Sequence, residues 1–122
     1  MSFPFENLEI YKHSLDFVEG VSKLLLTTKG KVSRSLVDQL TRASLSIPLN
    51  IAEGAGRWHL KEKLQFLRIS QGSTFECVAI IQVLSRQGVV KNDVYLSMYD
   101  QLQSIAKMNS GFIKSLEKRA SK

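Results

Sequence analysis

The stretch from residue 8 to residue 28 decides the fold class, and it reads LEIYKHSLDFVEGVSKLLLTT. Wound at 100° per residue, it places its apolar side chains on one broad side and its charged side chains on the other. The apolar side holds Leu8, Ile10, Tyr11, Leu15, Phe17, Val18, Val21, Leu24 and Leu25. The charged side carries ion pairs at helical spacing, such as Glu19 with Lys23, which suit a solvated face. The stretch therefore predicts an amphipathic helix that packs one face into a core.

The same helical period recurs in three further segments of the chain, and short breaks separate them. No alternating strand pattern, internal repeat or long linker occurs. Short connections between long helices make sequential neighbours antiparallel. The 122 residues therefore predict one all-α domain, an up-and-down antiparallel four-helix bundle with helices over about 8–28, 34–54, 60–87 and 93–119.

The second helix carries a start signal and an internal proline. We expect it to begin near Ser33 or Ser35, because Ser35 with Asp38 three residues later resembles a capping box. Pro48 lies inside the helix, where it lacks a hydrogen-bond donor and clashes with the carbonyl group of Ser44. We expect a kink at Pro48 and not two separate helices.

The third helix differs from the first because apolar residues occupy two of its sides. One side holds Leu60, Leu64, Leu67, Phe75 and Val78, and the other holds Phe66, Ile69, Cys77, Ile80 and Leu84. A helix in a lone four-helix bundle needs a single buried stripe, so the second side requires another partner. This pattern predicts that the chain associates with copies of itself.

The composition is that of a basic globular protein. Hydrophobic residues make up 43% and charged residues 23% of the chain, which argues against disorder and a fibrous class. No apolar run approaches the ~20 residues that span a bilayer, and the first residues do not resemble a secretion signal, so we expect a cytoplasmic location. The net charge of +6 favours polyanionic partners such as nucleic acids.

Residues that support catalysis or metal binding are sparse and scattered. Cys77 is the only cysteine, and its apolar neighbours favour a buried, inert thiol. His13 and His59 lie on different segments without the further ligands that a metal site needs. Gly54 and Gly56 follow a predicted helix and lack a Lys-Ser/Thr signature, which argues against a phosphate-binding loop. We therefore expect a non-enzyme without catalytic residues, metal or cofactor.

A polar stripe runs along the second helix beside the apolar one. It contains Gln39, Arg42, Ser46, Asn50, Glu53 and Arg57, and we assign Glu76 of the third helix to the same polar seam. The stripe suits either a contact surface for a ligand or nucleic acid, or a seam whose polar groups pair inside the fold or at an interface. Mixed charges with amides favour the seam, because polyanion sites prefer cations alone.

A basic cluster begins where the second helix ends. It comprises Arg57, His59, Lys61, Lys63, Arg68 and, further along the third helix, Arg86. These residues are either a nucleic-acid-binding surface or charges that keep the protein soluble. Trp58 lies among them and either stacks on a base or, as is commoner for a lone tryptophan, anchors a core or an interface.

A string of residues around Pro48 carries a family resemblance. The string is Gln39-Leu40-Thr41-Arg42-Ala43, then Ser46-Ile47-Pro48-Leu49-Asn50-Ile51-Ala52-Glu53-Gly54, then Arg57, Lys61, Glu62, Phe66, Leu67, Gly72-Ser73 and Glu76, with Leu8-Glu9-Ile10-Tyr11 ahead of it. Over nearly its whole length the chain resembles the four-helix-bundle proteins encoded in 23S rRNA intervening sequences. It departs from their pattern at His59, where Ser or Thr is common, and at Cys77, where a larger aliphatic residue is common.

This resemblance implies a homopentamer. It also implies a relation to the accessory variability protein of diversity-generating retroelements, a basic pentamer that binds nucleic acid and a reverse transcriptase. Together with the residues above, it predicts a homo-oligomer that binds RNA or DNA as an accessory or assembly factor. The alternative is a scaffold that docks a partner protein such as a polymerase or reverse transcriptase.

Overall fold

The computed structural model describes residues 2–120, which form four long helices. These are α1 (Glu9–Thr27), α2 (Arg34–Ala55), α3 (Leu60–Arg86) and α4 (Asn92–Ala120), with a short 3₁₀ turn, η1 (Pro4–Asn7), before α1. Residues 2–120 contain no strand. The prediction of an all-α, four-helix fold is therefore confirmed.

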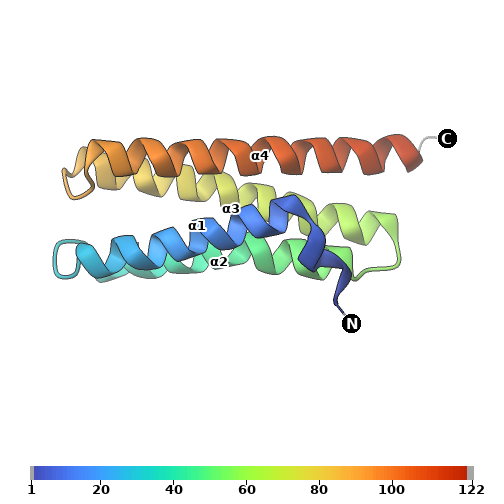
Figure 1. The fold of residues 1–122 in the computed structure, drawn as a ribbon, viewed down its shortest axis with the longest axis horizontal. Helices are drawn as coiled ribbons and strands as arrows, with labels where there is room; N and C mark the ends of the chain where they lie inside the picture. Colours follow the sequence, from blue (N-terminus) through green and yellow to red (C-terminus); the bar gives the residue numbers. More distant parts are fainter. Residues whose placement is uncertain (1, 121–122) are drawn as a thin grey trace.

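The four helices form a bundle in which α1 and α3 each pack against α2 and α4. The α1–α2 and α3–α4 loops lie together at one end of the long axis, which we call the two-loop end (Figure 1). The α2–α3 loop lies at the opposite end with η1 and the end of α4, and we call this the single-loop end (Figure 1). Side chains that are far apart in the sequence, at the start of α3 and the end of α4, therefore share one end of the bundle.

The second helix begins with a cap that differs from the predicted one. The hydroxyl of Ser33 accepts a hydrogen bond from the backbone N–H of Leu36 at 3.2 Å, so Ser33 is the N-cap. The expected capping box of Ser35 with Asp38 is wrong, because Ser35 lies inside the first turn of the helix. Asp38 instead forms an exposed ion pair with Arg34 at 3.7 Å.

Pro48 lies within α2, which runs through it as one helix from Arg34 to Ala55. The proline ring is buried, as is Ser44 one turn earlier. The hydroxyl of Ser44 donates to the carbonyl oxygen of Thr41 at 3.1 Å, so it is satisfied inside its own helix. The kink at Pro48 stays a prediction.

The core-facing side of α3 is a single stripe, and the two apolar sides assigned from the sequence are wrong. The buried stripe contains residues from both predicted sides, with two small hydroxyl residues between them. Its members are Leu67, Ser70, Thr74, Cys77, Ile81 and Leu84. Ser70 donates to the carbonyl oxygen of Ile47 and Thr74 to that of Ser70, both at 3.0 Å, so burial leaves neither hydroxyl unpaired. A prediction from apolar residues alone leaves out Ser70 and Thr74 and therefore divides this stripe into two sides.

Several apolar side chains of α3 nevertheless remain on the surface. Ile80 is 5% exposed and belongs to the core, and Phe66 is partly covered. Ile69, Phe75 and Val83 retain 45%, 60% and 42% of their surface. These three apolar side chains remain uncovered on α3, but they do not form the second apolar side that the sequence indicated.

A buried amide joins α3 to α4. Asn109 is fully buried, and its Nδ2 group donates to the carbonyl oxygen of Leu67 at 2.9 Å and to Oε1 of Gln71 at 3.1 Å. Gln71 in turn donates to the carbonyl oxygen of Ala106 at 3.1 Å. The Oδ1 atom of Asn109 has no hydrogen-bond partner among the described residues. This amide sits in a core that is otherwise mainly apolar.

Candidate nucleic-acid interface

The α2–α3 loop presents a tryptophan directly to solvent. Trp58 is 94% exposed, so the interpretation of this residue as a core anchor is wrong. His59, its neighbour, is the N-cap residue of α3 but makes no side-chain cap hydrogen bond. The ring of Trp58 is thus free to contact another molecule at the single-loop end.

Two of the predicted nucleic-acid-binding cations are held by carboxylates. Arg57 forms an ion pair with Glu53 at 3.5 Å, and its guanidinium lies 4.7 Å from the centre of the Phe66 ring. Arg68 pairs with Glu117 of α4 at 2.7 Å, which bridges the two helices. These partners offset part of the positive charge that the sequence assigned to a basic cluster.

Other cations at the single-loop end have no ion pair or hydrogen bond among the described residues. On α3 these are Lys61 and Lys63, and on α4 they are Lys114 and Arg119. Lys63 and Arg119 line one hollow of about 130 Å³ between the end of α2 and the facing parts of α3 and α4. The start of α3 and the end of α4 thus place these four cations toward the same end of the bundle, and we call them together the basic end.

The two α4 cations were missed by sequence reasoning. Lys114 and Arg119 are more than 50 positions from Lys61, and their helical pattern resembles an ordinary solvated face. The packing of α4 along α3 places both residues toward the single-loop end, and Arg119 lines the same hollow as Lys63. The predicted antiparallel order of the last two helices could have identified them, because it places the end of α4 beside the start of α3.

Arg86 does not belong to the basic end. It lies in the last turn of α3, whereas Lys61 lies in the first turn. At 1.5 Å per residue the two positions are separated by roughly 38 Å along the helix. Arg86 is exposed at the two-loop end, with Lys29 and Lys91 in the loops near it.

The polar seam of α2 is satisfied in its middle. Nδ2 of Asn50 donates to the backbone carbonyl of Ser46 at 2.8 Å and to its hydroxyl at 2.9 Å. That hydroxyl also accepts a hydrogen bond from Ser73 of α3 at 2.7 Å, a partner that the sequence did not assign to the seam. Gln39, Arg42 and Glu76 are exposed at its margins. The seam therefore links α2 to α3 and leaves charged groups on the outside.

An apolar strip accompanies the seam on the outer face of α2. Leu45 and Leu49 are 42% and 59% exposed. They line a surface hollow of about 530 Å³ together with Arg42, Asn50 and Glu53. Leucines exposed beside satisfied amides suit a protein contact better than a polyanion contact.

The described residues contain little that resembles a catalytic or metal site. Burial, with a smaller effect of the neighbouring Glu76 carboxylate, raises the pKa of the Cys77 thiol to about 12. Cys77 is fully buried, so the prediction of a buried thiol is confirmed, and its inertness stays a prediction. Within residues 2–120 no three His, Cys, Asp or Glu side chains come close enough to hold a metal ion. No helix in this range has the length and apolar content to cross a membrane.

Comparison with known proteins identifies a family and a solved structure with a similar fold. The family model described as 23S rRNA-intervening sequence protein matches residues 6–111. A crystal structure from Bacteroides thetaiotaomicron, described as a protein with unknown function from the S23 ribosomal protein family, superposes with a TM-score of 0.79. The two chains are 22% identical, and the match covers 86% of this chain and 98% of that one, so it shows the shared fold. No curated protein matches the chain.

Proposed function

The chain belongs to the family of 23S rRNA-intervening sequence proteins, and we propose that it is a non-catalytic homo-oligomer that binds nucleic acid with its basic end. The observation that carries this proposal is that Lys61, Lys63, Lys114 and Arg119, which have no ion pair among the described residues, all lie toward one end of the bundle. Cations without carboxylate partners contribute fully to counterion release when phosphates bind. The basic end is therefore the surface best suited to a nucleic-acid backbone.

Trp58 supports binding of unpaired bases at this surface. Its ring is 94% exposed and lies in the loop that leads into the cationic first turn of α3. An exposed aromatic ring beside cations stacks on a base while the cations contact the backbone, and this arrangement tolerates different sequences. We therefore propose single-stranded RNA or DNA as the preferred form.

Apolar surface on α2 and α3 supports the proposed self-association. Leu45, Leu49, Ile69 and Phe75 are each between 42% and 60% exposed, and all four would lose contact with water in an interface between copies. The family resemblance suggests five copies, with a mass of about 69 kDa from protomers of 13.8 kDa. Assembly multiplies the +6 charge of one chain into a stronger field for a polyanion.

Fluorescence anisotropy with a labelled single-stranded oligonucleotide tests the nucleic-acid proposal. We expect binding that weakens steeply as salt rises, with quenching of Trp58 emission on saturation. The double variant Lys61→Gln with Lys114→Gln should lower the salt slope by about one to two. The charge-matched control, Lys29→Gln with Lys107→Gln, should bind as the natural protein does. Absence of binding at low salt, or equal loss in both double variants, would refute the proposal.

Light scattering tests the self-association separately. We expect a mass several times 13.8 kDa, which falls toward that of one chain when Leu45 and Leu49 are both replaced by Glu. Leu26 is 75% exposed at the two-loop end, so Leu26→Glu is a matched control that should leave the assembly intact. A natural protein of about 14 kDa in solution would overturn the oligomer proposal and leave the nucleic-acid test unaffected.

The hollow beside the polar seam favours a second candidate function, that of a scaffold for a partner protein. A partner would cover Leu45 and Leu49 and pair with the exposed Arg42. Capture of a single protein that survives nuclease treatment and is lost in the Leu45→Glu, Leu49→Glu variant would support this candidate. Capture that nuclease abolishes would support the first.

A further inference from the structure

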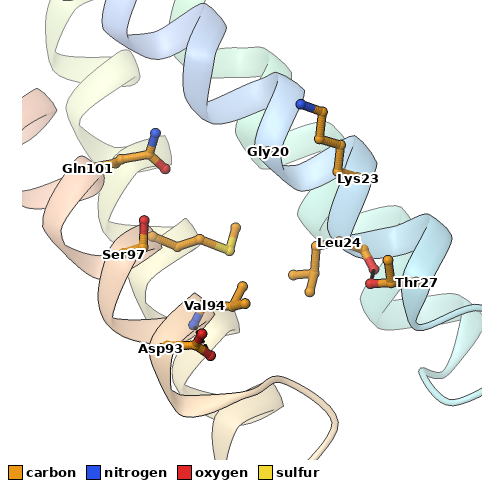
Figure 2. A pocket seen from close by; sticks show the side chains of 9 residues that line it. Gly20, Lys23, Leu24, Thr27, Asp93, Val94, Ser97 and Gln101 are labelled. Carbon is orange, nitrogen blue, oxygen red and sulfur yellow. Dashed lines mark hydrogen bonds between the residues drawn. The ribbon is translucent and has the colours of Figure 1, made fainter.

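An open groove lies between the first and last helices of the bundle. Figure 2 shows Leu24 of α1 and Val94 of α4 pointing toward one another from opposite walls, with Lys23 and Gln101 nearer the rim. The groove has a volume of about 490 Å³. Its walls are formed by Gly20, Lys23, Leu24 and Thr27 on α1 and by Asp93, Val94, Ser97, Met98 and Gln101 on α4.

Small residues on the walls keep this groove open. Gly20 contributes no side chain, and a Cβ atom placed there would meet no other atom within 4 Å. Ser97 and Thr27 are also short, whereas the floor is formed by the buried, apolar Leu24 and Met98. The groove thus has an apolar floor between two polar rims.

The groove continues to the two-loop end. A second hollow of about 360 Å³ shares Leu24, Thr27 and Val94 with it and adds Val89 and Val90 to the apolar lining. The two hollows are therefore neighbours along the α1–α4 seam, and we call them together the α1–α4 groove.

The rim of this groove is mainly positive. Lys31 and Lys91 line the second hollow and have no ion pair among the described residues. Lys23 lines the first hollow and is engaged only by an exposed pair with Glu19 at 3.4 Å. Among the described residues that line the two hollows, Asp93 alone is acidic. It lies in the first turn of α4, where a helix favours negative charge, and its Oδ1 accepts a hydrogen bond from the backbone N–H of Val94 at 2.9 Å.

We propose that the α1–α4 groove binds an amphipathic helix of a partner protein whose apolar stripe is flanked by acidic residues. On each wall the lining residues recur at intervals of three and four over eight or nine residues, about two helical turns or roughly 10–12 Å. A third helix laid along this seam buries its apolar stripe on Leu24, Val94 and Met98, as in other helix-in-groove complexes. The three rim lysines select acidic flanks over basic ones.

This surface is distinct from the basic end proposed to bind nucleic acid. Lys31 and Lys91 lie in the loops of the two-loop end, whereas Lys61 and Lys114 lie toward the single-loop end. The groove also has an apolar floor, which the phosphate backbone of a nucleic acid cannot use. Partner binding and nucleic-acid binding can therefore be separated by substitution.

Two synthetic peptides of about 18 residues test the proposal, each with Leu spaced to form one helical stripe. The first carries Glu beside the stripe and the second carries Lys. Fluorescence anisotropy with the full-length protein should detect binding of the Glu peptide and none of the Lys peptide. Failure of both peptides to bind, or equal binding of both, would overturn the proposal.

A groove-filling variant with a matched control locates the binding. Gly20→Leu places a side chain in the groove, whereas Gly72→Leu places one at a helical position of α3 that is also open, so both variants should fold. Gly20→Leu should weaken binding of the Glu peptide at least tenfold, and Gly72→Leu should leave it within about twofold. Equal binding to the two variants would overturn the proposal. The proposal would also be overturned if Gly20→Leu changed the oligomer mass and the protein bound no peptide, because that result would assign the groove to a second copy of the chain.

Charge reversal completes the test and separates it from the proposed function. Lys31→Glu with Lys91→Glu should lose the Glu peptide and retain the oligonucleotide. Lys61→Glu with Lys114→Glu should lose the oligonucleotide and retain the peptide. Loss of the peptide in both double variants would mean that overall charge and not the groove binds it, which would overturn the proposal.

Discussion

Replacing Gly54 with alanine tests how tightly the end of α2 approaches the start of α3. Gly54 is buried near the end of α2. A Cβ atom at this position would lie 3.1 Å from Cβ of Phe66 and 3.4 Å from the backbone carbonyl oxygen of Lys63. Neither atom is the far end of a flexible side chain, so the helices must move apart to make room.

The expected magnitude follows from two opposing effects. Alanine in place of glycine in a helix interior favours folding by about 0.5–1 kcal/mol. Forcing an extra carbon into a packed contact costs typically 1–3 kcal/mol. Gly111 lies inside α4, and a Cβ atom added there would meet no other atom within 4 Å, so Gly111→Ala should show only the favourable effect. The two variants should therefore differ by about 1–3 kcal/mol, with Gly54→Ala the less stable.

Urea denaturation followed by circular dichroism measures this difference. The natural protein and both variants should be compared at one protomer concentration, because unfolding of an oligomer depends on concentration. In thermal denaturation of the same samples, a difference of 1 kcal/mol corresponds to a shift in Tm of about 3–5 °C for a chain of this length. If Gly54→Ala proved as stable as Gly111→Ala, the close approach of α2 and α3 at Gly54 would be refuted.

Three further predictions concern the core, the thiol and the bridge between α3 and α4. Leu102→Ala should lower the free energy of unfolding by about 2–5 kcal/mol in urea denaturation, because Leu102 is fully buried; a loss under about 1 kcal/mol would contradict this packing. Because the pKa of Cys77 is raised in the folded chain, the unfolded chain loses the thiol proton first as pH rises. The contribution of this group to the free energy of unfolding is therefore complete below about pH 9 and falls as pH rises toward 12. The natural protein should therefore lose more stability than Cys77→Ala between about pH 8 and 10, and identical losses would contradict the shift. Glu117→Gln should free Arg68, change stability by less than about 1 kcal/mol and strengthen oligonucleotide binding at low salt in the anisotropy assay; weaker binding would contradict the offsetting role of Glu117.

The sequence was sufficient to predict the helices because their amphipathic period is local. It failed on the core-facing side of α3, where Ser70 and Thr74 lie between Leu67 and Cys77. These hydroxyls become compatible with burial only because backbone carbonyls lie within reach, and one of those carbonyls, that of Ile47, belongs to another helix. A hydropathy pattern contains no information about such partners.

Prediction of the candidate site was less complete for a similar reason. The sequence identified Lys61 and Lys63 but could not show that Arg57 and Arg68 have carboxylate partners, one of them on α4. It also could not join Arg119 to Lys63, because their shared hollow depends on how far α4 extends along α3. Cations without an ion-pair partner contribute most to binding a polyanion, and the packing of the helices decides which cations have such a partner.

The buried Asn109 fixes the register of α4 along α3. If α4 slid by one turn along α3, the amide would lose both the Leu67 carbonyl and Gln71 and would face hydrocarbon instead. Leucine-rich surfaces tolerate such sliding, whereas a single enclosed amide penalises every misaligned arrangement. Asn109 thereby determines where α4 ends along α3, and so keeps Arg119 and Lys63 in the same hollow.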